Sequence, residues 1–171
     1  MEPPHYLDEA MAALRKWQDL VFAEMEALST NYRMECERVN EQATSYKQRS
    51  VLRLQTYRRV AGQGKSNTDG NHLQAKWNRV RFFKSGGKPV REMQSIKKSE
   101  GQDCYSMTQL KEYAQDWEWP IVEKLEKQLG LLRRQASFIA QGITQLRYAK
   151  MAEDRYNERY VYNDPDDSPS E

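Results

Sequence analysis

The stretch PIVEKLEKQLGLLRRQASFIAQGITQL, residues 120–146, indicates the fold more clearly than any other part of the chain. Apolar residues follow one another in it at alternating steps of three and four, the spacing of one face of an α-helix. They are Val122, Leu125, Leu129, Leu132, Ala136, Ile139, Ile143 and Leu146. Pro120 suits a first helical turn, and we expect the helix to continue to about residue 160. Gly130 and Gly142 each cost about 1 kcal/mol relative to alanine, which the close approach of another helix would explain.

A second apolar stripe runs through the N-terminal part of the chain. Its members are Leu7, Met11, Leu14, Val21, Met25, Leu28 and Tyr32, continued after one irregular step by Cys36, Val39, Ala43 and Tyr46, with Gln18 in the remaining slot. No proline or glycine occurs between Pro4 and Gly62. The pattern predicts a helix from about residue 6 to about residue 48, roughly 60 Å long at 1.5 Å per residue.

Apolar stripes this narrow need a partner to cover them. The simplest arrangement packs the two helices against each other as an antiparallel coiled-coil stalk. Pairing of each helix with a second copy of the chain, which would make a homo-oligomer, is equally compatible with the sequence. The expected fold is mainly α, of the α+β class, with a small basic head that contains a β-hairpin inserted between the two helices.

Composition excludes several classes of protein. The chain has 171 residues, of which 38% are hydrophobic and 30% charged, which suits long helices better than a large globular core. No apolar run approaches the length of a membrane span, and the start MEPPHYLDEA does not have the pattern of a signal peptide. Cys36 and Cys104 lack the spacing of a disulfide framework or a zinc site. We therefore expect a cytoplasmic protein with free thiols.

Charge is distributed unevenly along the chain. Residues 1–46 carry 4 basic and 9 acidic side chains, and residues 99–171 carry 9 basic and 14 acidic ones, a balance of −5 in each case. Residues 47–98 carry 14 basic and 2 acidic side chains, a balance of +12. A basic segment of this kind indicates an anionic partner, most often nucleic acid. The alternative is that it docks on the acidic parts of its own or another chain.

Residues 72–98 have the pattern of a β-hairpin. KWNRVRFF, residues 76–83, is followed by the turn signal Gly86-Gly87 and by the strand-like VREMQSIKK, residues 90–98. By the period of two, Trp77, Arg79, Arg81 and Phe83 share one face, and Val80 and Phe82 the other. One face is expected to pack on a helix and the other to present cations. The pair Arg79 and Arg81 is the first candidate for contact with DNA.

A short helix over residues 107–114 should follow, because Ser106 and Gln109 have the spacing of a capping box. Asp116 and Glu118, in the break DWEWP, are interpreted as capping and pairing residues. The chain then divides into five parts: residues 1–60, an N-terminal helix; 61–71, a flexible linker; 72–119, the basic hairpin and short helix; 120–160, the C-terminal helix; and 161–171, a disordered acidic tail.

Arginines on a two-stranded β-ribbon are a known means of entering a groove of duplex DNA. Contact with phosphates is expected for most of them, rather than reading of bases. The candidate DNA-binding residues are Arg58, Arg59, Arg79, Arg81, Lys84, Lys88, Arg91, Lys97 and Lys98.

A Gly-Lys-Ser triplet at residues 64–66 resembles the end of a phosphate-binding loop, but Arg59 stands where that loop needs its first glycine. We therefore expect a linker here and no nucleotide at Lys65. His5 and His72 are far apart, so the tyrosine-rich segment RYNERYVYN, residues 155–163, lacks the histidine cluster of a tyrosine nuclease. Neither a catalytic site nor a cofactor or metal is expected.

The order of these features resembles the MobI-like family of conjugative-transfer auxiliary proteins. WNRVRFF, a strand ending in IKK, and WEWPIVEKLEKQLGLLRRQ carry the resemblance over residues 75–150. The matching positions are Trp77, Arg79, Ile96, Lys97, Lys98, Tyr105, Leu110, Trp117, Glu118, Glu126, Leu132 and Arg133. Where the family commonly has a glycine after the lysine pair, this chain has Ser99, with Gly101 two positions later.

The resemblance implies a non-enzymatic accessory protein that binds DNA at the origin of transfer, beside a relaxase. The alternative is a helical interaction or inhibitor protein, such as a plasmid or phage counter-defence protein, whose basic patch meets an acidic protein surface.

Overall fold

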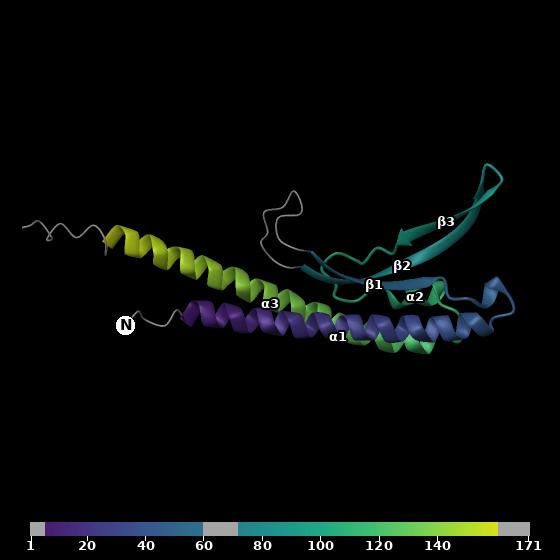
Figure 1. Ribbon diagram of the computed structural model, residues 1–171, viewed down its shortest axis with the longest axis horizontal. Helices are drawn as coiled ribbons and strands as arrows, with labels where there is room; N and C mark the ends of the chain where they lie inside the picture. Colours follow the sequence, from purple (N-terminus) through teal and green to yellow (C-terminus); the bar gives the residue numbers. More distant parts are fainter. Residues whose placement is uncertain (1–5, 60–71, 161–171) are drawn as a thin grey trace, which may run out of the picture.

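The computed structural model describes residues 6–59 and 72–160. They form three α-helices, a short 3-10 turn and a three-stranded antiparallel sheet, so the fold is mixed α and β (Figure 1). The predicted linker, with Lys65, and the predicted acidic tail lie outside the described residues.

Two long helices, α1 (Tyr6–Gln42) and α3 (Trp119–Tyr160), lie side by side and run in opposite directions (Figure 1). The Tyr32 hydroxyl donates to the Glu118 carboxylate where α3 begins. Toward the other end, the Lys150 ammonium lies 2.5 Å from an oxygen of Asp8. The two helices thus pair within one chain.

The sheet has the order β1-β2-β3, with β1 (Leu52–Arg59), β2 (His72–Ser85) and β3 (Lys88–Ser95). The predicted hairpin is confirmed, because Ser85 lies opposite Lys88 across a two-residue turn. Gly86 and Gly87 have φ of 56° and 79°. Positive φ at both central residues defines the turn that suits twisted hairpins and favours glycine there.

The predicted extent of the N-terminal helix is wrong at its end. Helix α1 stops at Gln42, and the chain continues through the 3-10 turn η1 (Tyr46–Gln48) into β1. Leu52 and Leu54 are buried on one side of β1 while Gln55 is exposed, which is the alternation of a strand with one open face.

The core lies between the two long helices and one face of the sheet. That face carries Trp77, whose ring packs against the Tyr32 ring in an edge-to-face arrangement with 5.1 Å between the centroids. The face of the hairpin that shares Trp77 is therefore the one packed toward the helices. Val80, on the opposite face, is buried outside this core cluster.

The short helix α2 (Met107–Tyr113) begins where the sequence predicts. The Ser106 hydroxyl oxygen accepts a hydrogen bond from the Gln109 backbone N–H at 3.3 Å. Leu110, on this helix, is fully buried in the core. Among the described residues, no helix combines the length and the apolar character that crossing a bilayer requires.

Candidate nucleic-acid interface

The end of the β2–β3 hairpin extends beyond the helices as a free ribbon (Figure 1). All residues from 81 to 95 are exposed except Val90, which is half-buried. We call residues 81–92 the projecting ribbon. Its two strands still pair in register, with Arg81 opposite Glu92.

The two faces of the projecting ribbon differ in charge. Residues directly opposite each other in an antiparallel pair point to the same face, so Arg91 shares a face with Phe82, and Lys84 lies two residues farther along that face. Phe82 is 71% exposed. We call Phe82, Lys84 and Arg91 the outer ribbon face. Arg81 points to the other face, where its cross-strand neighbour is the acidic Glu92.

Arg79 lies on the packed side of the hairpin. It shares the face of Trp77, is half-buried, and places its guanidinium 4.3 Å from the centroid of the Tyr113 ring on α2. A guanidinium held over an aromatic ring is attracted to it by a cation–π interaction. Arg79 therefore connects the sheet to α2, and Arg81 is the exposed member of the pair chosen from the sequence.

Arg58 is also engaged within the fold. Its guanidinium pairs with Asp19 on α1 and lies 5.3 Å from the centroid of the Phe22 ring. Its Nε is buried and has no hydrogen-bond partner among the described residues. Arg59 closes β1 opposite His72, and its side chain is not among the described ones.

Lys97 and Lys98 are exposed and follow the end of β3 that lies away from the turn. The Lys98 ammonium donates to the Gln102 carbonyl oxygen. At about 3.3 Å per residue, β3 separates this pair from the turn by roughly 25 Å. The candidate residues thus do not form one site: Arg81, Lys84, Lys88 and Arg91 are together on the projecting ribbon, and the others lie apart from it.

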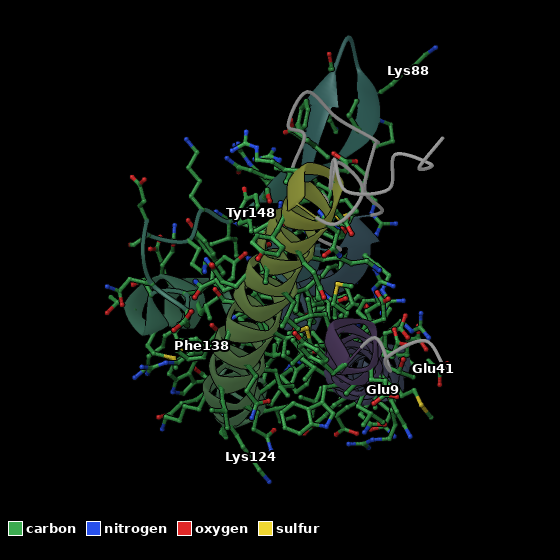
Figure 2. All side chains as sticks on the ribbon, turned by 90° about the vertical axis from the view of Figure 1, so that its left-hand side faces the viewer. Glu9, Glu41, Lys88, Lys124, Phe138 and Tyr148 are labelled. Carbon is green, nitrogen blue, oxygen red and sulfur yellow. The ribbon has the colours of Figure 1, made fainter. Side chains whose placement is uncertain are left out.

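Figure 2 shows that the cations of the projecting ribbon lie away from the acidic side chains of α1. Lys88 stands at the tip of the projecting ribbon, while Glu9 and Glu41 lie on α1, on the far side of the molecule. The ribbon cations are therefore held away from the acidic α1.

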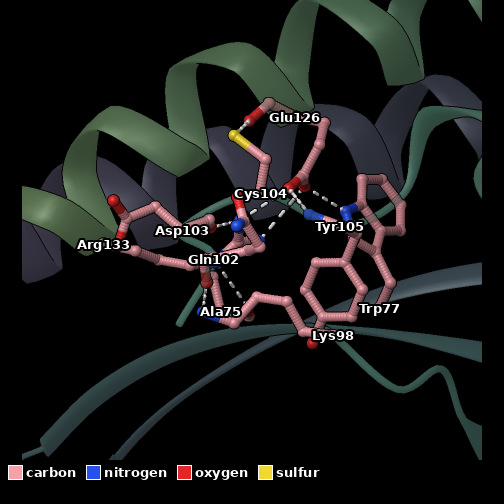
Figure 3. Close-up of polar contacts among 9 residues, drawn as sticks. All are labelled: Ala75, Trp77, Lys98, Gln102, Asp103, Cys104, Tyr105, Glu126 and Arg133. Carbon is pink, nitrogen blue, oxygen red and sulfur yellow. Dashed lines mark hydrogen bonds and ion pairs between the residues drawn. The ribbon is translucent and has the colours of Figure 1, made fainter. Parts of the chain in front are cut away.

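A buried network that the sequence analysis did not identify is centred on Glu126 (Figure 3). Glu126 is fully buried on α3 and accepts hydrogen bonds from the Trp77 indole N–H at 2.6 Å and the Tyr105 backbone N–H at 2.7 Å. Arg133 binds it with two nitrogens, at 2.7 and 3.1 Å. The Arg133 guanidinium also donates to the carbonyl oxygens of Ala75 and Asp103. The network joins α3, β2 and the segment before α2.

A signal for this pair was present in the sequence. Glu126 and Arg133 are seven residues apart, which is close to two helical turns and places them on one side of α3. They adjoin the apolar stripe at Leu125 and Leu132. Opposite charges at such positions are compatible with an ion pair, but only the position of Trp77 shows that they are covered.

Glu118 forms a second buried network, at the start of α3. Its carboxylate accepts from the hydroxyls of Tyr32 and Ser50 and, at 3.1 Å, from the Gln115 backbone N–H. The Cys36 thiol lies 3.7 Å from the same carboxylate. Burial, and next the charge of Glu118, raise the pKa of Cys36 to about 11. The same two causes raise the pKa of Tyr32 above its ordinary value. Glu118 thus joins α1, the approach to β1 and α3, so the partners of this predicted capping and pairing residue come from distant segments.

Eight of the twelve positions that carry the family resemblance are buried. They are Trp77, Ile96, Tyr105, Leu110, Glu118, Glu126, Leu132 and Arg133. These positions therefore maintain the packing and the two polar networks. The outer ribbon face is not among them.

Within residues 6–59 and 72–160, no group of three histidine, cysteine or acidic residues is placed to hold a metal ion. Among known proteins, a family described as MobI protein matches residues 21–147 of the chain. That range contains the whole described sheet, both buried networks and most of each long helix. No curated protein and no solved structure matches the chain.

Proposed function

Because this chain belongs to the MobI protein family, we propose that it is a non-enzymatic accessory protein that binds duplex DNA at the origin of transfer, beside a relaxase, when conjugative transfer begins. Family membership supports a role in the mobilisation of a mobile genetic element. DNA binding and the place of action are the further steps that we propose.

The observation that carries DNA binding is the outer ribbon face. It presents Lys84 and Arg91 beside the exposed ring of Phe82, on a two-stranded ribbon that extends away from the helices. A ribbon of this width fits the major groove of DNA, and cations on it reach the phosphates that border the groove. Lys88 and Arg81 add positive charge at the tip and on the second face.

The paired helices serve in this proposal as a stalk that holds the ribbon, with coiled-coil packing along their shared apolar stripes. The opposite side of α1 exposes Trp17, Leu20 and Met34. At about 100° per residue, the three side chains lie within roughly 100° of one another around the helix axis, so they share one broad side of α1. We propose this side as the contact for the relaxase or another protein.

The test is binding of a labelled duplex that carries the origin of transfer, measured by fluorescence anisotropy over a series of salt concentrations. Each phosphate contact contributes a slope of about −0.9 in log K against log salt. Replacing both Lys84 and Arg91 with glutamine should reduce the slope by about 1.8 by the same relation. Arg79→Ala with Arg81→Ala is a less specific variant, because Arg79 also packs on Tyr113.

The matched control replaces two exposed lysines away from the ribbon, Lys16→Gln and Lys124→Gln, and should leave the slope unchanged. A scrambled duplex of equal length tests whether the origin of transfer is recognised. A parent protein that binds no duplex at low salt would contradict DNA binding. The basic ribbon would then be assigned to an acidic protein partner.

A further inference from the structure

A groove of about 1260 Å³ runs beside the second half of α3, apart from the projecting ribbon. One wall is formed by α3 between Arg133 and Tyr148, and the other by the start of β2 and the segment that follows β3. The volume exceeds the range of roughly 300 to 1,000 Å³ that is usual for small-molecule sites. An extended ligand suits this shape better than a compact one.

Two aromatic side chains line the groove and remain open to solvent. Phe138 is 60% exposed and Tyr148 is 61% exposed. Figure 2 shows both on the side of α3 that faces away from α1. They are ten residues apart, so about 15 Å of helix axis separates them. Neither belongs to the core. The Arg134 guanidinium lies 5.8 Å from the centroid of the Phe138 ring, and both rings remain largely exposed to solvent.

The charge of the groove is predominantly positive. Lys76, Lys97 and Lys98 line the wall opposite α3, and Asp103 is the one acidic residue among the described residues of the lining. Arg147 lines the α3 wall and interacts within the fold. Arg133 also borders it, but Glu126 matches its charge. The remaining lining includes side chains that can hydrogen-bond to a polar ligand, such as Gln141, Thr144 and Gln145.

We propose that this groove binds single-stranded DNA, with bases stacked on Phe138 and Tyr148 and phosphates held by the lysines of the opposite wall. Exposed aromatic rings in a cationic groove are the combination by which proteins bind single strands, because only an unpaired strand presents the faces of its bases. The choice of a single strand rests on the groove, and the choice of DNA over RNA rests on the proposed function.

The test measures binding of fluorescein-labelled dT12 to the full chain by anisotropy. Phe138→Ala combined with Tyr148→Ala should weaken dT12 binding at least tenfold, because stacking contributes substantially at each base. Duplex affinity should change less than twofold, because neither residue lies on the projecting ribbon. Leu131→Ala is the matched control, since Leu131 is 59% exposed on the same helix and does not line the groove.

A second pair of variants tests the charges. Lys97→Gln with Lys98→Gln should lower the salt slope for dT12 by about 1.4, at 0.7 for each phosphate on a single strand. Lys16→Gln with Lys124→Gln should leave it unchanged.

Three results would overturn the proposal: no binding of dT12 by the parent at low salt, parental affinity in the aromatic double variant, or an equal loss of duplex binding in that variant. Tighter binding of rU12 than of dT12 would overturn the choice of DNA. If the ribbon variants bind duplex DNA as the parent does, duplex binding by the projecting ribbon is contradicted. Binding of a single strand in the groove is not affected by that result.

Discussion

Glu126 and Arg133 hold together three segments that are far apart in the chain. Both side chains are buried and form an ion pair with each other. The Glu126 carboxylate also accepts hydrogen bonds from Trp77 and Tyr105. Removing one member of such a pair leaves an unmatched charge in the interior. That cost is usually larger than the net contribution of the intact pair.

We predict that Glu126→Leu and Arg133→Met each lower the free energy of unfolding by about 3–5 kcal/mol. The double variant should lose clearly less than the sum of the two, because no unmatched charge remains. Urea denaturation followed by circular dichroism measures all three values. Additive losses would show that the two side chains act independently.

The thiols make a second prediction at this scale. With a pKa of about 11, Cys36 should react very slowly with a disulfide reagent at pH 8, because the thiolate is the reactive form. Cys104 is exposed, but burial of its sulfur, and next the charge of Glu126, raise its pKa as well. This thiol should therefore react more slowly than a free cysteine but well before Cys36, which should react only on unfolding. Cys104→Ser should remove the faster phase. Two thiols of equal rate at pH 8 would contradict the burial of Cys36.

The Cys36 thiol also affects the free energy of unfolding at alkaline pH. Folding raises the pKa of Cys36 above its ordinary value of 9.0, so the folded state retains a proton that the unfolded chain loses first. The contribution to stability is full below pH 9 and is lost as the pH rises toward 11. Tyr32, whose pKa is also raised, adds to the loss in the same direction. Denaturation measured across this range should show the fall.

At the scale of elements, the two glycines inside α3 have different reasons for being there. A Cβ on Gly142 would lie 3.0 Å from Leu14 Cδ1, so this glycine lets α1 approach closely. A Cβ on Gly130 would lie 2.1 Å from the sulfur of Cys104, in the segment before α2. The close approach at Gly130 is therefore to a loop and not to the other helix.

Gly130→Ala should destabilise the protein by about 1–3 kcal/mol, because the segment at Cys104 must move. In a Cys104→Ala background the obstructing sulfur is absent. The same substitution should then stabilise the protein by up to about 1 kcal/mol through helix propensity. Thermal unfolding of the four proteins measures the reversal of sign. Gly142→Ala is the comparison, with a smaller effect because the end of a leucine side chain can rotate.

At the scale of the whole molecule, we expect the projecting ribbon to contribute little to the free energy of unfolding of the helical body. Residues 81–95 are exposed apart from Val90, so they contribute little to the core. Four residues can be removed from each strand, 82–85 and 88–91, so that Gly86-Gly87 joins Arg81 directly to Glu92. A shift of four preserves which face each residue occupies and the alternation of hydrogen-bonded pairs.

We predict that this shortened protein folds with nearly the parental unfolding temperature and loses binding of duplex DNA. It should still bind dT12, because the groove beside α3 is intact. Circular dichroism and anisotropy measure the two properties. Parental duplex binding in the shortened protein would show that the ribbon is not the contact.

Several features could be predicted from the sequence alone, namely the two long helices, the hairpin with its glycine turn and the Ser106 cap. Each depends on residues within a few positions of one another. An apolar stripe, two glycines with positive φ and a capping hydroxyl act locally, so their effect does not depend on where the rest of the chain lies. The positive charge of residues 47–98 was also evident, although its distribution in space was not.

Only the tertiary structure decided which of these charges are available and which face of the hairpin is buried. Arg58 appears free in the sequence, yet Asp19, 39 residues earlier, pairs with it. Glu118 is buried because Tyr32 and Ser50 reach it from 86 and 68 residues away. Leu52–Arg59 is a strand because β2 pairs with it in antiparallel register. Burial and charge pairing depend on contacts between distant segments, and no local pattern specifies those contacts.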